Sequence, residues 1–218
     1  MRIVKSIIFK IISFFIRLNS KIQKRKNGDP NLFELNSKHL KNLKVISNRD
    51  ELLKKLPHHS IVAEMGVDKG EFSEKILNIT NPKKLFLIDA YHTKRYSLKK
   101  YELVKNKFQY EINNNIIELK KGYSTEFASH FSDHFFDWIY IDTDHTYYTT
   151  KQELELYAPK IKPGGFICGH DYVLGNWNSH FKYGVIEAVR EFCVNYNWEL
   201  VYLTFEGHNH HSFCIRRL

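Results

Sequence analysis

The chain has 218 residues, 43% of them apolar, which is enough for one well-buried α/β domain and too few for two large ones. Its three cysteines are odd in number and more than twenty residues apart, which excludes a disulfide framework or a C-x-x-C metal site, so we expect reduced thiols in a cytoplasmic protein. Residues 1–28 carry +8 of the +9 net charge, so the rest lacks the spread basic surface of a nucleic-acid-binding protein.

Residues 1–26 have the pattern of a basic amphipathic helix, whose apolar side is centred on Ile7, Ile11, Phe14, Phe15 and Leu18. Four basic residues among the first seventeen make it too short and too charged to span a bilayer. We expect it to lie on an anionic membrane surface, at the inner face of the membrane. The same helix is also suited to packing on the domain or on a second copy in a homo-oligomer, and the sequence leaves these alternatives open.

The next segment leads into the first buried strand. Residues 35–56 are polar and lysine-rich with scattered leucines, which predicts one or two surface helices. Residues 61–72 read IVAEMGVDKGEF, a strand that ends at Glu64 and opens through Gly66 and Gly70 onto a helix over 71–79. This arrangement brings backbone N–H groups and a helix N-terminus to one point, where a ligand can lie. The dinucleotide fingerprint G-x-G-x-x-G is absent, which argues against a pyrophosphate cradle.

Four further short apolar runs alternate with segments able to form helices, which is the pattern of parallel βαβ units. They cover residues 85–88, 116–119, 136–141 and 166–169. In an open parallel sheet the carboxyl ends of the strands line one crevice, and ligands bind there. We therefore expect the polar residues that follow the strands to converge, namely Glu64, Asp89, Ser124, Asp142 and Asp171.

The C-terminal part predicts a helix over 185–196 and two closing strands over 199–204 and 212–215, the last one antiparallel. The loop between these strands contains His208, His210 and His211. Such a cluster resembles a metal site, but Glu206 is the only acid near it in sequence. We interpret the segment as a histidine-rich surface loop.

The segment from Glu64 to Gly70 resembles motif I of the class I S-adenosylmethionine (SAM) methyltransferases. The resemblance implies a Rossmann-like α/β fold with a mostly parallel seven-stranded sheet and an antiparallel last strand, over residues 59–218. Residues 1–28 are then the basic helix, and 29–58 a linker and helical lead-in. Asp89 ends the second strand, where a carboxylate can accept both hydrogen bonds of a ribose diol. The cofactor-binding residues implied are Glu64, Gly66, Gly70, Asp89, Ala90, Tyr91, Ser124 and Asp142.

The richest segments are I-D-T-D-H-T-Y, residues 141–147, and G-H-D-Y, residues 169–172. Asp142 and Asp171, at the ends of neighbouring strands, can bind one divalent cation such as Mg²⁺. A cation there would acidify a substrate hydroxyl. His145 is then placed to take the proton, because an unperturbed imidazole titrates near neutral pH.

These two segments resemble the metal-dependent O-methyltransferases of the macrolide-sugar type and their broader relatives, which share I-D-x-D-H-x-Y and a later G-x-D-Y. The resemblance implies Asp142 and Asp171 as metal ligands and His145 as the catalytic base. The third implied ligand is His170, where the family usually has an acid. Histidine suits magnesium poorly, so a softer cation, a weak site and catalysis without metal all stay open.

We therefore expect a SAM-dependent methyltransferase that acts on a hydroxyl of a small-molecule or sugar-type acceptor. The alternatives are transfer to nitrogen, another reaction on the same fold as in cephalosporin hydroxylase-like relatives, and a non-catalytic membrane-docked binding protein. Nucleic-acid methylation is disfavoured, because neither N-P-P-Y nor D-P-P-Y follows the fourth strand.

Overall fold

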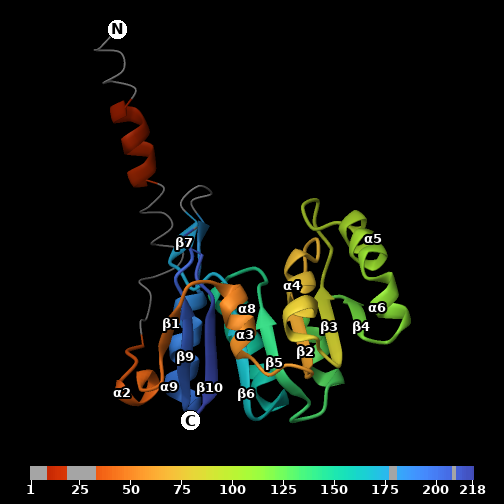
Figure 1. Cartoon of the computed structure of the whole chain (residues 1–218). Helices are drawn as coiled ribbons and strands as arrows, with labels where there is room; N and C mark the ends of the chain where they lie inside the picture. The colour runs from red at the N-terminus through yellow and green to blue at the C-terminus, as the bar shows by residue number, and fades with distance from the viewer. Residues whose placement is uncertain (1–8, 19–32, 177–180, 208–209) are drawn as a thin grey trace. The chain divides into compact units, whose positions relative to one another are not determined.

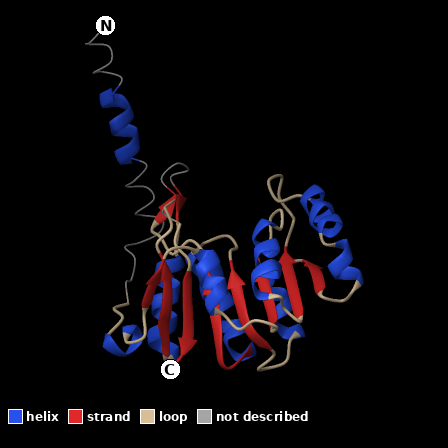
Figure 2. Ribbon diagram, in the orientation of Figure 1, coloured by secondary structure: helices blue, strands red, loops and turns tan. Residues whose placement is uncertain are grey.

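The computed structural model describes residues 9–18, 33–176, 181–207 and 210–218, and the structural statements below concern these residues. The chain divides into two units, Met1–Leu32 and Phe33–Leu218. The first unit contains a helix over residues 9–18. The second contains a central sheet with helices against it, which Figure 1 shows by element and Figure 2 by type of secondary structure.

The central sheet has eight described strands. Strand β10 is antiparallel to both of its neighbours, and the other pairs of adjacent strands are parallel. This is the Rossmann-like sheet with an antiparallel last strand that the sequence predicts, with one strand more than expected. In sheet order the strands are β1 (Lys44–Ile46), β9 (Trp198–Thr204), β10 (Phe213–Arg217), β6 (Ile161–Gly169), β5 (Phe136–Ile141), β2 (Ile61–Met65), β3 (Lys84–Asp89) and β4 (Ile117–Lys121).

The additional strand is β1, which lies within the segment expected to be helical. It has only three residues and pairs in parallel with β9, with Val45 opposite Leu203. As an edge strand it leaves Val45 63% exposed. Three residues are too few to show the two-residue alternation of a strand, and the partner is far away in the chain. The sequence pattern therefore missed it, although the helices on either side, α2 and α3, agree with the expectation.

Helices cover both faces of the sheet and make it the middle of three layers (Figure 2). Side chains of α3, α4, α5 and α6 join one hydrophobic cluster, and side chains of α7, α8 and α9 join the other. Two strands of two residues each, β7 (Gly175–Asn176) and β8 (Phe181–Lys182), follow β6 and pair antiparallel to each other. The helices are α2 (Ser37–Leu40), α3 (Arg49–Lys55), α4 (Glu71–Thr80), α5 (Leu98–Lys107), α6 (Gln109–Asn113), α7 (Ser124–Phe127), α8 (Tyr147–Tyr157) and α9 (Val185–Tyr196), with short 3-10 turns η1 (Ala128–His130) and η2 (Ala158–Lys160).

Strand β5 lies between β6 and β2 and contributes to both hydrophobic clusters. Trp138 and Tyr140 pack on one face, and Ile139 and Ile141 pack on the other, as expected of a strand whose side chains alternate. Full burial of a large apolar side chain is worth about 1.5–3 kcal/mol, so this strand is held firmly from both sides. The residue that follows it, Asp142, therefore has a fixed position at the carboxyl edge of the sheet.

Candidate active site

The turns that leave neighbouring strands are joined by backbone hydrogen bonds at the carboxyl edge of the sheet (Figure 1). The N–H groups of Gly66, Asp142 and His170 donate to carbonyl groups of β3, β2 and β5 at 2.9, 2.7 and 2.9 Å. The main chain after β2, β5 and β6 thus runs side by side. Residues far apart in the chain, such as Met65 and Asp142, meet along this edge.

Gly66 allows the closest of these approaches. Its φ of +86° lies in the left-handed region, which favours glycine. A Cβ atom added here would lie 1.9 Å from the carbonyl oxygen of Asp142. Any side chain would therefore push the turn after β2 away from the turn after β5. This glycine sets how near the motif I turn comes to the acid–histidine segment.

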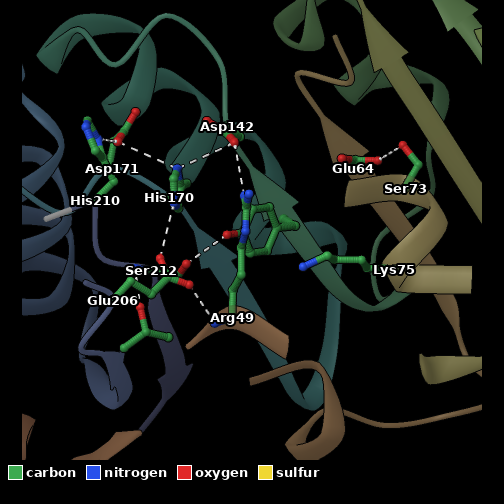
Figure 3. A network of polar contacts seen from close by, with 12 residues as sticks. Arg49, Glu64, Ser73, Lys75, Asp142, His170, Asp171, Glu206, His210 and Ser212 are labelled. Carbon is green, nitrogen blue, oxygen red and sulfur yellow. Dashed lines mark hydrogen bonds and ion pairs between the residues drawn. The ribbon is translucent and has the colours of Figure 1, made fainter. Parts of the chain in front are cut away.

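Glu64 is buried within β2 and does not reach the surface. Its side chain is 1% exposed and accepts a hydrogen bond from the Ser73 hydroxyl of α4 (Figure 3). Burial raises the pKa of Glu64 to about 8, although the Ser73 hydrogen bond opposes this shift. The carboxyl is therefore protonated at neutral pH and joins β2 to α4 from inside the protein.

Asp89 holds the motif I turn through its carboxylate. One oxygen accepts hydrogen bonds from the N–H groups of Val67 and Asp68 at 2.9 and 3.0 Å, and the other accepts from the Tyr91 N–H at 3.0 Å. A carboxylate has about four lone-pair sites, so the three amides leave roughly one for a ligand. The residue expected to bind a ribose thus also shapes the loop around it.

The other residues expected on the cofactor side have different environments. Tyr91 is 3% exposed, and its hydroxyl has no hydrogen-bond partner among the described residues. Ala90 is half-buried. Gly70 precedes α4 with a φ of +71°, and an added Cβ would lie 2.7 Å from the Phe108 ring. Gly70 therefore permits packing against Phe108, whereas the Tyr91 hydroxyl is a buried polar group that no described residue hydrogen-bonds.

Ser124 belongs to a buried network around Glu153 of α8. The hydroxyls of Ser124 and Thr143 each donate to the Glu153 carboxylate, the second at 2.9 Å. The Ser124 carbonyl accepts from the Tyr157 hydroxyl at 2.7 Å. Burial raises the pKa of Glu153 to about 7 against the effect of these hydrogen bonds. The Ser124 hydroxyl is thus engaged inside the protein, next to the turn that carries Asp142.

His145 lies between two carboxylates. Its Nε2 atom is 3.0 Å from an Asp142 oxygen and 2.9 Å from an Asp171 oxygen. The backbones of His145 and Asp171 are both in the left-handed region, with φ of +62° and +56°. The Tyr183 ring packs near the imidazole, with the ring centroids 4.8 Å apart. Carboxylates from the ends of β5 and β6 therefore contact the same imidazole nitrogen.

The charges in this cluster shift the pKa values of His145 and Asp171. Burial lowers the pKa of His145, but hydrogen bonds and attraction from Asp142 and Asp171 raise it by more, to about 10. Burial raises the pKa of Asp171, but His145 and its other imidazole neighbours lower it by more, to about 2. In this arrangement the imidazole is protonated and the Asp171 carboxylate is ionised. His145 can accept a proton only when that negative charge is neutralised or moved.

His170 faces the same two carboxylates from the other side (Figure 3). Its Nδ1 atom is 3.7 Å from an Asp142 oxygen and 3.6 Å from an Asp171 oxygen. One ligand atom from each of Asp142, His170 and Asp171 lies within 4.8 Å of the other two. The structure thus brings together the three residues that the sequence analysis names as metal ligands.

Two residues of the loop after β9 complete this cluster. The Nε2 atom of His170 is 3.5 Å from a Glu206 oxygen, and the other Glu206 oxygen accepts the Arg49 N–H at 2.6 Å. Burial raises the pKa of Glu206, but His170 and Arg49 lower it by more, so the carboxylate is ionised. His210 is hydrogen-bonded through Nδ1 to the Asp171 carboxylate. The interpretation of this loop as a plain surface loop is therefore wrong for His210, while His208 lies outside the described residues.

Sequence reasoning missed four residues of the site: Arg49, Glu153, Glu206 and His210. Glu153 had a local signal, because it lies on the same helix face as the buried Thr150, Leu154 and Tyr157. Arg49 and Glu206 had none, because their partner lies 157 positions away. Only the fold brings the loop after β9 to the ends of β5 and β6.

The sequence matches the family described as "Methyltransferase domain" over residues 25–172. This chain belongs to that family. The matched part contains the motif I turn, Asp89, the Asp142–His145 segment and Asp171. The family is SAM-dependent, so the protein is assigned as a SAM-dependent methyltransferase. The match does not single out the macrolide-sugar type, and no curated relative matches the sequence significantly.

Solved structures agree on the fold of this methyltransferase. A protein described as an rRNA-methylase from Clostridium thermocellum has 16% identity and a TM-score of 0.58, with 79% of this chain and 99% of that chain covered. A SAM-dependent methyltransferase from Aquifex aeolicus has 12% identity and a TM-score of 0.56, with 83% and 93% covered. A tRNA methyltransferase from B. subtilis has 12% identity and a TM-score of 0.56, with 79% and 67% covered. At these identities the likeness concerns the fold alone.

Proposed function

We propose that this methyltransferase transfers a methyl group to a hydroxyl of a small-molecule or sugar-type acceptor, with a divalent cation at Asp142, His170 and Asp171. The observation that carries the proposal is the contact between the turn after β2, which contains Gly66, and the segment that contains Asp142 and His145. Gly66 lies against the Asp142 carbonyl, and the Asp142 side chain is 3.0 Å from His145. A cofactor at the turn and a proton acceptor at His145 would therefore be neighbours.

The residues near the turn fit a bound nucleoside. Gly66 presents its main chain without a side chain, Asp89 keeps about one free lone-pair site, and the buried Tyr91 hydroxyl has no partner among the described residues. A buried hydroxyl without a partner costs free energy, which a polar group of a ligand would recover. Bound SAM supplies an electrophilic methyl group. The contribution of this chain is to hold the adenosyl part beside Asp142 and to exclude water around it.

The proton of the acceptor hydroxyl is assigned to Nε2 of His145. Asp142 and Asp171 both contact this nitrogen and orient the ring, and they also keep it protonated in the present arrangement. Asp142, His170 and Asp171 would hold the cation, whose positive charge would lower the pKa of a bound hydroxyl. The two carboxylates would then attract the His145 proton less strongly, and the pKa of His145 would move back towards its ordinary value. Proton acceptance at His145 thus depends on the state of both aspartates.

A small acceptor fits the charge distribution better than a nucleic acid. Outside residues 1–28 the chain has a net charge of only +1, the remainder when +8 is taken from +9. Binding to phosphate backbones needs a set of basic residues around the site. The names of the rRNA and tRNA methyltransferases with a similar fold therefore do not carry their acceptors over to this chain.

Binding of S-adenosylhomocysteine tests the cofactor part of the proposal. We expect isothermal titration calorimetry to show one site in the wild-type protein and a clear loss of affinity in Asp89→Ala. The matched control is His58→Ala, an exposed histidine in the turn before β2, which should bind normally. A wild-type protein that binds neither SAM nor S-adenosylhomocysteine would overturn the proposal.

Transfer to nitrogen and a non-catalytic role remain the alternatives. Once an acceptor is known, removal of divalent cations should abolish oxygen methylation and leave nitrogen methylation largely intact. His145→Ala should abolish turnover if the protein is an enzyme of this kind. A binding protein would keep its biological activity in His145→Ala and lose it when residues 1–26 are deleted.

We also propose that residues 1–26 bind an anionic membrane surface. In the helix over 9–18, apolar side chains such as Phe9, Phe14 and Phe15 are 61–72% exposed, while Lys10 and Arg17 share its polar side. None of the described helices is long and apolar enough to cross a bilayer. Apolar burial in the interface and attraction to acidic lipids act together for such a helix. The strong positive charge of residues 1–28 selects an acidic surface as the partner.

Vesicle sedimentation tests this contact. The full chain should pellet with vesicles that contain phosphatidylglycerol and stay in solution with pure phosphatidylcholine. Replacing both Phe14 and Phe15 by Glu should abolish pelleting, and Ser13→Ala should leave it unchanged. If the wild type pellets with neither vesicle, the membrane proposal fails, and a concentration-dependent dimer in gel filtration would point to a second copy instead.

A further inference from the structure

The orientation of His170 is fixed from behind by a carboxylate. Its Nε2 atom is 3.5 Å from Glu206, which is itself held by the Arg49 N–H. Glu206 is largely buried, with a side chain 13% exposed. The imidazole thus turns its Nε2 edge to Glu206 and its Nδ1 edge to Asp142 and Asp171. An outer carboxylate of this kind orients a metal-binding histidine and raises its basicity.

One potential ligand atom from each of Asp142, His170 and Asp171 faces the same point. The distances from His170 Nδ1 to Asp142 and Asp171 are 3.7 and 3.6 Å, beyond the 2.7–3.2 Å of ordinary hydrogen bonds. Ligand atoms bound to one ion at about 2.1 Å are separated by roughly 3.0–3.4 Å. A small contraction would thus convert the observed spacing into the spacing of an ion's ligands.

A second imidazole lies beside this point. His210 is hydrogen-bonded to the same Asp171 oxygen that faces His170. The rings of His170 and His210 are nearly parallel, with centroids 6.2 Å apart and an interplanar angle of 22°. His210 and Glu206 belong to one loop, so that loop supplies both a hydrogen-bond partner of Asp171 and the carboxylate behind His170. Figure 3 shows these residues around Asp171 and Asp142.

Donor chemistry indicates which ion this set prefers. Magnesium takes oxygen ligands almost exclusively, whereas imidazole suits zinc, cobalt, nickel and iron. An imidazole beside two carboxylates, in place of a third acid, shifts the preference towards ions of the second kind. We propose that Asp142, His170 and Asp171 form a centre for a divalent transition ion, tested here with zinc, which binds in preference to magnesium, and that His210 orients Asp171 as an outer partner. The proposal rests on the proposed function, because it names the cation of the same site.

The ion is measured directly, without cofactor or acceptor. Tag-free full-length protein is freed of metals with a chelator and titrated with ZnCl₂ or MgCl₂ in a calorimeter. We expect one zinc site with an affinity about 100-fold above that for magnesium. CoCl₂ should give visible absorption bands of a nitrogen- and oxygen-ligated ion. Equal or tighter binding of magnesium would overturn the proposal.

Variants connect the binding to these residues. His170→Ala should weaken zinc binding at least about 10-fold, and His210→Ala and Glu206→Gln, as outer partners, about 10–100-fold. His170→Asp should lower zinc affinity and raise magnesium affinity, because it adds an oxygen donor. The control His58→Ala should bind zinc like the wild type. Zinc binding that is unchanged in both His170→Ala and His210→Ala would assign the ion elsewhere and overturn the proposal.

Folding and cofactor binding are followed on the same samples. If His170→Ala loses its far-ultraviolet circular dichroism, Glu206→Gln and His210→Ala carry the test. S-adenosylhomocysteine binding without preference for zinc would overturn the ion proposal alone. Zinc binding as expected, in a protein that binds no SAM or S-adenosylhomocysteine, would overturn the methyltransferase function and leave the ion site standing.

Discussion

The cofactor side and the histidine side of the sheet edge use the same residue types differently. On the cofactor side, within the last residues of β2 and β3, Glu64 is paired with the Ser73 hydroxyl and Asp89 with three backbone N–H groups. On the histidine side, after β5 and β6, Asp142 and Asp171 face imidazoles. Neutral donors satisfy the first pair from within the chain. The second pair faces positive charge, from the Arg49 guanidinium 3.9 Å from an Asp142 oxygen and from the protonated His145, and is therefore the side able to do chemistry.

The largest effect is expected where the two sides touch. Gly66→Ala places a Cβ 1.9 Å from the Asp142 carbonyl oxygen at a φ of +86°, so the turn must move. We expect a loss of about 3 kcal/mol or more in the free energy of unfolding, with little residual S-adenosylhomocysteine binding. Urea unfolding and calorimetry measure the two effects.

Gly164→Ala is the matched control for this substitution. Gly164 also has a left-handed backbone, with φ of +77°, but an added Cβ meets no atom within 4 Å. Only the conformational cost of about 1 kcal/mol should remain, and cofactor binding should be normal. Equal losses in the two variants would mean that backbone strain, and not the contact between the two sides, governs the effect.

On the histidine side, the charge of His145 should make the stability of the protein depend on pH. His145 has a pKa raised from 6.5 to about 10, so its contribution is complete below pH 6.5 and is lost as the pH rises through about 10. His145→Gln should therefore destabilise the protein at pH 6.5 by on the order of 2 kcal/mol, with the difference shrinking towards pH 10. Urea unfolding at a series of pH values measures it, with His58→Gln as control. A constant difference from pH 6.5 to 10 would contradict the ion pair.

The smallest effect is expected on the cofactor side, at Glu64. Its pKa is raised from 4.5 to about 8, so its contribution is complete below pH 4.5 and is lost as the pH rises through about 8. Glu64→Gln keeps an acceptor for Ser73 and adds no charge. At pH 5 it should change the free energy of unfolding by less than about 1 kcal/mol, and by pH 8 it should be the more stable form. A large destabilisation at pH 5 would show that the carboxylate is ionised there.

Most of the sheet could be predicted from local patterns. The apolar runs that became β2, β3 and β5 are strongly β-prone and end in polar residues, so both their existence and their order along the edge were readable. Strand β1 was not, because three residues carry no periodicity and its stability comes from pairing with β9. Long-range pairing, rather than intrinsic preference, decides such an edge strand.

The candidate site divides in the same way. Asp142, His145 and Asp171 stood out because each follows a strand, and the fold brings them within hydrogen-bond distance. The contacts of Glu206 and His210 were invisible, because a loop more than thirty positions beyond β6 folds back onto it. Spacing along the sequence cannot reveal these contacts. They form only because β10 pairs with β6 and β9, which brings the loop before β10 to the end of β6.

Local chemistry alone determined that acids end the strands and that a glycine follows the first of them, since alternating burial and a left-handed turn are properties of a few neighbouring residues. Tertiary structure decided which of those acids is neutral, which is held by amides and which is left facing imidazoles. The reason is that protonation and free lone pairs depend on burial and on partners brought from far along the chain, at distances of 3 to 4 Å where electrostatic interactions are strong.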